Sequence, residues 1–262
     1  MPPTASNWSD VQSLWSADHN FWMTGPCAPF DFNFPPIDRV IAEMRTDDMT
    51  RITAGTKSNR RVSDDIKDRF NALPIDQAVQ SPFALAHFEL SRFDAPGKFL
   101  HGFEQKVLTP WRSALRDAGF TYERCYPIVF MSGIDCATNY HCDQSHVIAW
   151  QIHGSKEFNS LADPTRWVTI DQCIHGLADQ LTRPPDLTPD DIITHEMHPG
   201  DVLWNALLTP HWVDAADQPA MSVNFSHGGL RLNGQLAPRE QALVDYRAAH
   251  PDQAPSPVTS HY

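Results

Sequence analysis

The feature that most constrains this chain is the triplet His141-Cys142-Asp143, which is followed by His211 sixty-eight residues after the aspartate. Successive side chains of a β-strand point to opposite faces, so a strand over residues 139–143 places His141 and Asp143 on one side. A second strand is then needed to bring His211 opposite them. Two imidazoles and one carboxylate on one face of a cation leave the other face open, an arrangement typical of mononuclear Fe(II) sites. The spacing therefore predicts a fold in which two distant strands meet at a metal.

Spacing alone is weak evidence, because histidines and acidic residues are both plentiful. With 13 His and 32 Asp plus Glu in 262 residues, about 1.6 His-x-acid triplets are expected by chance. The chain contains three, and the other two are His87-x-Glu89 and His250-x-Asp252. Only the triplet described above is followed by an apolar strand and later by a Pro-Gly turn that enters another strand, at residues 199–204. That context favours it as the ligand pair.

Composition indicates one compact domain. A chain of 262 residues is long enough to bury a substantial core. Its net charge of −12 disfavours a surface that tracks nucleic-acid phosphates. Five cysteines, an odd number without paired spacing, indicate reduced thiols in the cytoplasm. No apolar run reaches the roughly twenty residues of a membrane span, and no secretory signal is visible.

Three regions are expected along the chain. Residues 1–120 form an arm and helices packed on the core, residues 121–235 form the core, and residues 236–262 form a Pro-bearing tail. The first 36 residues are rich in Trp, Phe and Pro without a regular period, which is typical of an aromatic arm. Helical periods are expected over residues 37–45, 63–73 and 98–118, with a short strand over residues 51–53.

From residue 121 onward the sequence pattern changes to short apolar strands separated by turns. A helical prelude followed by such strands predicts a mostly β fold with flanking helices, built around a jelly-roll core, the double-stranded β-helix. Residues 161–189, which carry four prolines, are expected to form an inserted loop. Strands are expected near residues 124–131, 139–143, 146–152, 156–159, 192–197, 201–204, 211–214 and 220–226.

The segment from Thr138 to Lys156 resembles the signature of the cupin-like, Jumonji-C-type Fe(II)- and 2-oxoglutarate-dependent oxygenases. It is especially similar to the asparaginyl hydroxylases that act on hypoxia-inducible factor. In that family a threonine three residues before the first histidine and a lysine fifteen after it bind the far carboxylate of 2-oxoglutarate. Thr138 and Lys156 match both offsets from His141. The resemblance implies Fe(II), 2-oxoglutarate and O2 as cofactor and co-substrates, with His141, Asp143 and His211 as metal ligands.

The second half of the core carries the same resemblance. Residues 199–202 and His211-x-Val213 are similar to the family's distal-histidine strand. Residues 221–225 are similar to the strand that follows it, and Asn224 matches a position that is often polar near the metal. The resemblance covers residues 120–230 and none of the first 120.

Elementary chemistry gives two of these residues a role that does not depend on the resemblance. Lys156 offers a compact cation to a carboxylate, and the Thr138 hydroxyl offers a second donor. Thr138 has odd parity relative to His141, so its role requires an irregular backbone near Asn139.

The resemblance implies hydroxylation of an unactivated C–H bond in a peptide, a protein side chain or an amino acid. N-methyl-lysine demethylation uses the same iron chemistry and remains open. A metal-binding cupin that acts as a sensor, isomerase or hydrolase also remains open, although it would not need the carboxylate clamp of Lys156 and Thr138. No nucleic-acid or membrane partner is expected, and the chain is expected to be a monomer or a small homo-oligomer. Candidate substrate contacts are Arg92, Arg124, Tyr126 and Arg231.

Overall fold

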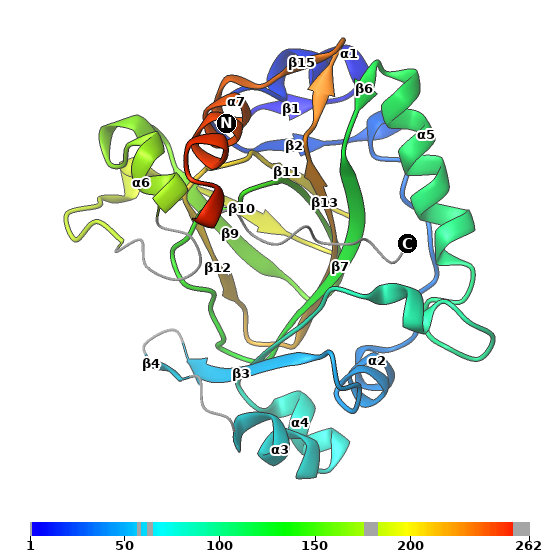
Figure 1. Cartoon of the computed structure of the whole chain (residues 1–262). Helices are drawn as coiled ribbons and strands as arrows, with labels where there is room; N and C mark the ends of the chain where they lie inside the picture. The colour runs from blue at the N-terminus through cyan, green and yellow to red at the C-terminus, as the bar shows by residue number, and fades with distance from the viewer. Residues whose placement is uncertain (1, 57–58, 62–64, 176–182, 254–262) are drawn as a thin grey trace.

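The computed structural model describes residues 2–56, 59–61, 65–175 and 183–253, and within them a large β-sheet faces a smaller one (Figure 1). The large sheet has the strand order β1-β2-β11-β8-β13-β7-β5-β3-β4, and the smaller one has the order β10-β9-β12. A third small sheet has the order β15-β14-β6. The strands are β1 (Thr4–Ala5), β2 (Phe21–Met23), β3 (Arg51–Thr56), β4 (Asn59–Arg61), β5 (Phe83–His87), β6 (Phe120–Thr121), β7 (Arg124–Ser132), β8 (His146–His153), β9 (Lys156–Leu161), β10 (Ile192–Met197), β11 (Val202–Asn205), β12 (His211–Ala215), β13 (Ala220–Gly228), β14 (Arg231–Leu232) and β15 (Gln235–Leu236).

Strand β13 shows why the two sheets enclose a polar interior. It is buried along its whole length and pairs antiparallel with both β7 and β8. Its residues alternate, so Val223 and Phe225 enter the main apolar core, while Ser222 and Asn224 point to the opposite face, toward the smaller sheet. Alternation of this kind, with both faces buried, is what a double-stranded β-helix requires. The expected fold class, mostly β with flanking helices around a jelly roll, is confirmed.

The outer face of the large sheet is covered by aromatic side chains and by helix α5 (Thr109–Asp117). Phe30 stacks on Phe225 with ring centroids 4.9 Å apart, and Trp111 of α5 lies 5.1 Å from Phe30. Offset rings in this distance range attract each other beyond their area of contact. This layer holds the N-terminal arm against the sheet on the side away from the smaller sheet.

The N-terminal region is more regular than its sequence indicates. Residues 8–14 form helix α1, and residues 21–23 form β2, which extends the large sheet beside β11. The expectation of an arm without regular structure is therefore wrong for these residues. Their aromatic content concealed the strand because Phe21 enters the outer core, whereas Trp22 packs with the interior cluster around Phe158.

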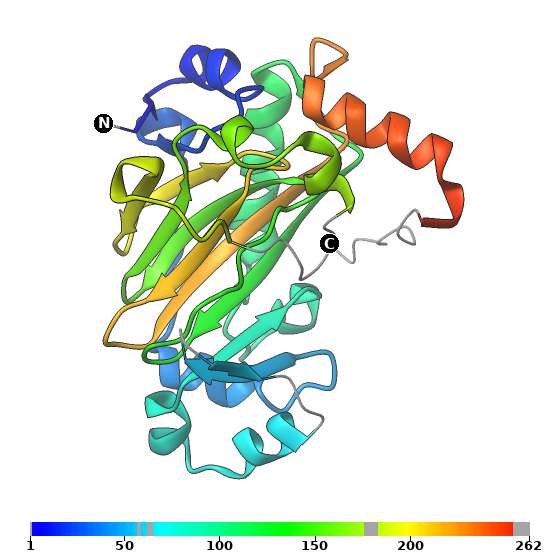
Figure 2. The same ribbon diagram turned by 90° about the vertical axis from the view of Figure 1, so that its left-hand side faces the viewer.

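Helices occupy both ends of the molecule, with α3 and α4 at one end and α7 at the other (Figure 2). The expected helix over residues 98–118 starts later, as a π-helical turn at Glu104–Leu108 that continues into α5. Helix α7 was not expected in the tail. None of the described helices is long and apolar enough to cross a membrane. The helices are α1 (Trp8–Leu14), α2 (Ile37–Met44), α3 (Asp65–Ala72), α4 (Ile75–Gln80), α5 (Thr109–Asp117), α6 (Ile170–His175) and α7 (Pro238–Ala249).

One expected strand is absent from the described residues. Residues 139–143 form no ladder, and only isolated bridges join Ala137 to Asp214 and His141 to His211. The other expected core strands are present as β7 to β13. The region that carries the His-x-Asp triplet is therefore an irregular segment held to β12 at two points.

Replacing Phe225 tests the outer aromatic layer. Its side chain is fully buried between the sheet and the arm, so Phe225→Ala should lower the free energy of unfolding by about 3–5 kcal/mol. Denaturant unfolding measures the change. Met49→Ala, at a side chain that is 44% exposed, should stay within about 0.5 kcal/mol of the parent. Equal effects of the two substitutions would contradict the assigned core.

Candidate metal centre

His141 and His211 are brought together by backbone pairing. The amide of His141 donates to the carbonyl of His211 at 3.0 Å, and the amide of His211 donates to the carbonyl of His141 at 2.9 Å. Directly opposed antiparallel residues have neighbouring side chains, so both imidazoles leave the backbone at the same point. Their ring centroids lie 4.2 Å apart.

Asp143 completes the cluster. Its carboxylate oxygens lie 3.8 Å from Nε2 of His141 and 3.6 Å from Nε2 of His211. All three ligand atoms lie within 4.8 Å of one another, so one cation can reach them all. The carbonyl of Asp143 accepts a hydrogen bond from the amide of Leu208 at 2.8 Å, which ties the irregular segment to the turn before β12. The structure thus gathers the three expected ligands.

Hydrogen bonds fix both imidazoles in the form that binds metal. Nδ1 of His141 lies 2.6 Å from the carbonyl oxygen of Asn139, and Nδ1 of His211 lies 2.9 Å from that of Thr209. A carbonyl oxygen only accepts, so the proton lies on Nδ1 and the lone pair of Nε2 faces the site. Burial also lowers the pKa of His211 to about 4, so this ring is neutral at neutral pH, as a ligand must be.

Two neighbours orient the ligands further, and sequence reasoning did not find either of them. The amide of Asn205, the last residue of β11, donates to Asp143 at 3.1 Å. Phe158 of β9 stacks on the ring of His211 at 4.9 Å. In the sequence, Asn205 is a polar residue directly after the apolar run of its strand, and this position could have marked it as a candidate site residue.

The cluster is buried on one side and open on the other. The side chain of His211 is 3% exposed, whereas those of His141 and Asp143 are 29% and 32% exposed. The apolar cluster around Phe158 and Met197 lies in the interior beside it. A cation held here keeps accessible coordination positions, as a catalytic metal requires and a purely structural metal does not.

Lys156 lies in the same interior with a buried ammonium group. The residue is 5% exposed, and Nζ donates to the carbonyl of Phe130 at 3.2 Å and to the hydroxyl of Ser222 at 3.4 Å. No carboxylate lies within ion-pair distance of Nζ among the described residues. Burial lowers the pKa of Lys156 to about 8. A cation in this position favours an anionic occupant.

The other two expected binding residues occupy different settings. The Thr138 hydroxyl accepts a hydrogen bond from the amide of Val213 at 2.7 Å and keeps its own proton to donate. Val213 and Lys156 lie on the paired strands β12 and β9. Asn224 faces the interior from β13, and its Oδ1 has no hydrogen-bond partner among the described residues. The irregular backbone that a role for Thr138 requires is present.

Buried polar atoms without partners line this interior. Within the described ranges they include Oδ1 of Asn205, Oδ1 of Asn224 and Oγ of Ser160. Ser160 pairs with His211 across the smaller sheet. Buried polar groups are normally satisfied, so this concentration indicates space that a polar ligand or water fills.

The competing triplets and most candidate substrate contacts lie elsewhere. His87 pairs with Asp47 at 3.1 Å. Arg92 binds Asp47 and Asp48, and Arg231 binds Glu123. The remaining two candidates, Arg124 and Tyr126, share the inward register of Ile128 on β7.

The fold and this cluster together define a cupin-like protein with a candidate mononuclear metal centre. Solved structures with the same fold include YcfD, a ribosomal oxygenase from Escherichia coli, in complex with cobalt and 2-oxoglutarate. That structure has a TM-score of 0.56 and 16% identity, and the alignment covers 100% of this chain but 63% of YcfD. YcfD with cobalt and succinic acid gives a TM-score of 0.55 and 15% identity, with the same coverage. At this identity the likeness establishes the fold alone. No family model and no curated protein sequence matches the chain.

Calorimetric titration with Co(II) tests the metal centre. The parent protein should bind one ion, and Asn205→Ala should weaken binding by about 10- to 100-fold because Asp143 loses its orienting donor. His141→Ala should weaken it further. His198→Ala, at an exposed ring paired with Glu196, is the matched control. Unchanged affinity in His141→Ala would refute the assignment.

Lys156→Met tests the energetic cost of the buried ammonium group. The pKa of Lys156 is about 8 in the folded protein, below its ordinary 10.5, so the unfolded chain holds the proton more tightly. The destabilisation therefore grows as pH falls from 10.5 to 8, and at pH 7 it amounts to about 3 kcal/mol. Without metal or ligand, Lys156→Met should be more stable than the parent at pH 7, with a smaller advantage near pH 9.5. Urea unfolding at the two pH values measures this. Lys106→Met, at an exposed position, should show no such pH dependence, and a loss of stability in Lys156→Met would contradict the prediction.

Proposed function

We propose that this protein is an Fe(II)- and 2-oxoglutarate-dependent oxygenase that hydroxylates a C–H bond. The observation that carries the proposal is the combination, in one barrel interior, of an open His-Asp-His cluster and a buried lysine without a carboxylate partner among the described residues. The cluster alone would suit several divalent metals. The lysine adds a demand for an anion, which a simple metal-binding cupin does not have.

The shared fold with YcfD supports the same reading. One structure of YcfD contains cobalt with 2-oxoglutarate, and another contains cobalt with succinic acid. In this chain His141, Asp143 and His211 would hold the metal. Lys156, with the Thr138 hydroxyl as second donor, would hold the far carboxylate of 2-oxoglutarate.

The protein's own contribution is positioning and exclusion of water. Asn205 and the carbonyls of Asn139 and Thr209 orient the three ligands. The apolar cluster around Phe158 covers one side of the ligands and limits the access of water from that side. Iron, when bound, supplies the oxidative chemistry that couples decarboxylation of 2-oxoglutarate by O2 to hydroxylation of the substrate.

For the substrate we infer a peptide, a protein side chain or an amino acid. The likeness of residues 138–156 to the asparaginyl hydroxylases supports this class, and YcfD is a ribosomal oxygenase. Arg124 and Tyr126, which share the inward register of β7, remain our candidate contacts. We also infer a cytoplasmic location, since all five cysteines are thiols.

The test is succinate formation by anaerobically purified, iron-loaded protein given 2-oxoglutarate and O2. The parent protein should form succinate slowly without a substrate. A substrate found in a peptide and amino-acid library should speed this reaction, and the product made from that substrate should contain one additional oxygen atom. Lys156→Met should raise the concentration of 2-oxoglutarate needed by about 10- to 100-fold, because a charge-assisted hydrogen bond is lost. Lys106→Met serves as the matched control.

Three results would count against parts of this proposal. Tight metal binding without any succinate would favour a sensor, isomerase or hydrolase. Release of formaldehyde from an N-methylated peptide would show that the reaction is demethylation and not stable hydroxylation. Equal loss of metal from His141→Ala and Lys156→Met would contradict their separate roles.

A further inference from the structure

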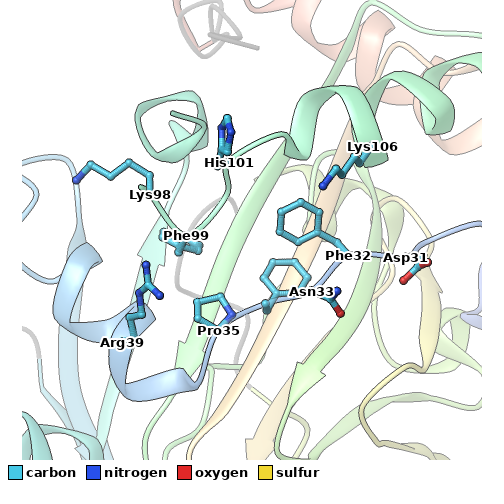
Figure 3. Close-up of a pocket in the computed structure, with 10 residues that line it drawn as sticks. Asp31, Phe32, Asn33, Pro35, Arg39, Lys98, Phe99, His101 and Lys106 are labelled. Atoms are coloured by element: carbon cyan, nitrogen blue, oxygen red, sulfur yellow. The ribbon is translucent and has the colours of Figure 1, made fainter. Parts of the chain in front are cut away.

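A hollow lies on the opposite side of the large sheet from the metal centre. It has a volume of about 450 Å³, and it is bounded by the arm, by α2 and by the segment that leads into α5 (Figure 3). The arm residues Phe30 and Phe34 pack on Phe225 and Trp150, whose side chains belong to the outer core. The hollow therefore has no part in the chemistry proposed above.

The lining of this hollow is basic, although the chain as a whole carries a net charge of −12. Arg39, Lys98 and Lys106 contribute cations, and His101 adds a ring that can donate a hydrogen bond. Asp31 is the one carboxylate among the lining residues, and it lies at the rim in Figure 3. Such a local excess of positive charge attracts anions.

Two of the three cations are available to a ligand. Lys98 is engaged, since its Nζ lies 3.2 Å from the carboxylate of Glu43. Arg39 and Lys106 form no ion pair within the part of the chain that the structure describes. Figure 3 shows them on opposite sides of the hollow, with Lys106 directed toward Phe32. Two positive charges on facing walls match a dianion better than a single carboxylate.

Aromatic side chains form part of the remaining wall. Nζ of Lys106 lies 5.9 Å from the ring centroid of Phe32, whose ring also contacts Phe34 and Phe103. Lys106 itself lies on the π-helical turn, a wide geometry that recurs at functional sites. The hollow thus combines cations with aromatic side chains.

We propose that this hollow binds a small organic phosphate that carries a flat aromatic ring, of the size of a nucleotide. Arg39 and Lys106 would hold the phosphate from two sides, since guanidinium and ammonium groups form strong charge-assisted bonds to phosphate oxygens. Phe32 and Phe34 would contact the flat ring. A volume of about 450 Å³ lies within the range of small-molecule sites.

The test is calorimetry at about 0.15 M salt, where weak long-range attraction is screened. The protein is the full chain carrying His141→Ala, in the presence of a metal chelator, so that phosphate cannot bind through a metal. The probes are ADP, pyrophosphate and adenosine. ADP should bind saturably, pyrophosphate more weakly and adenosine not at all. The double variant Arg39→Glu/Lys106→Glu should weaken ADP binding by about a hundredfold.

The matched control is Arg69→Glu/Arg116→Glu, which makes the same change in charge at exposed positions outside the hollow. It should leave ADP binding unchanged, and circular dichroism checks that both double variants are folded. The inference is overturned if ADP does not bind, or if the control weakens binding as much as the Arg39/Lys106 pair. Much tighter binding of a single-stranded RNA than of ADP through the same residues would overturn the assignment to a small molecule. None of these outcomes depends on the proposed oxygenase activity.

Discussion

The candidate metal centre depends on two backbone hydrogen bonds, which join His141 to His211. No ladder surrounds this pair, and the next bridge along the segment is Ala137 to Asp214. The pairing nevertheless places two imidazoles at one point from positions seventy residues apart. Every other contact of the site, from the Asn205 amide to the stacked ring of Phe158, adjusts ligands that this pair has already brought together.

The polar groups in the interior of the barrel lower the stability of the folded protein. A buried ammonium group and several buried polar atoms without a protein partner among the described residues lower the stability of the folded protein, since protein hydrogen bonds replace their lost hydration only in part. The aromatic layer on the outer face offsets this cost, because Phe225, Trp111 and Phe30 bury large apolar surfaces there. A ligand that satisfies Lys156 would recover part of the loss, so the destabilising features are those expected of a binding site.

Much of the core could be predicted from the sequence because its signals are local. Alternation and turn residues located β7 to β13, and the spacing of His141, Asp143 and His211 identified the cluster that the structure gathers. The irregular backbone at residues 139–143 could not be predicted from the sequence, since it arises from pairing with β12 at isolated points. The expectation that His141 and Asp143 lie on one side was correct, but it assumed a regular strand where the backbone is irregular.

Other features depend on tertiary contacts that a single sequence does not reveal. Strand β2 is too short to show a period and exists because it pairs with β11. Helix α7 begins at Pro238, and its Glu240 is buried against the amide of Gly229 rather than solvated, which obscures its amphipathic pattern. Asn205 contacts Asp143 only because β11 ends beside the irregular segment.

The most direct test of the account is a crystal structure with Co(II) and 2-oxoglutarate, with the metal located by its anomalous scattering. The account predicts a single ion bound by His141, Asp143 and His211, with 2-oxoglutarate on its open side and the far carboxylate at Lys156. An ion bound elsewhere, or 2-oxoglutarate whose far carboxylate lies away from Lys156, would contradict it.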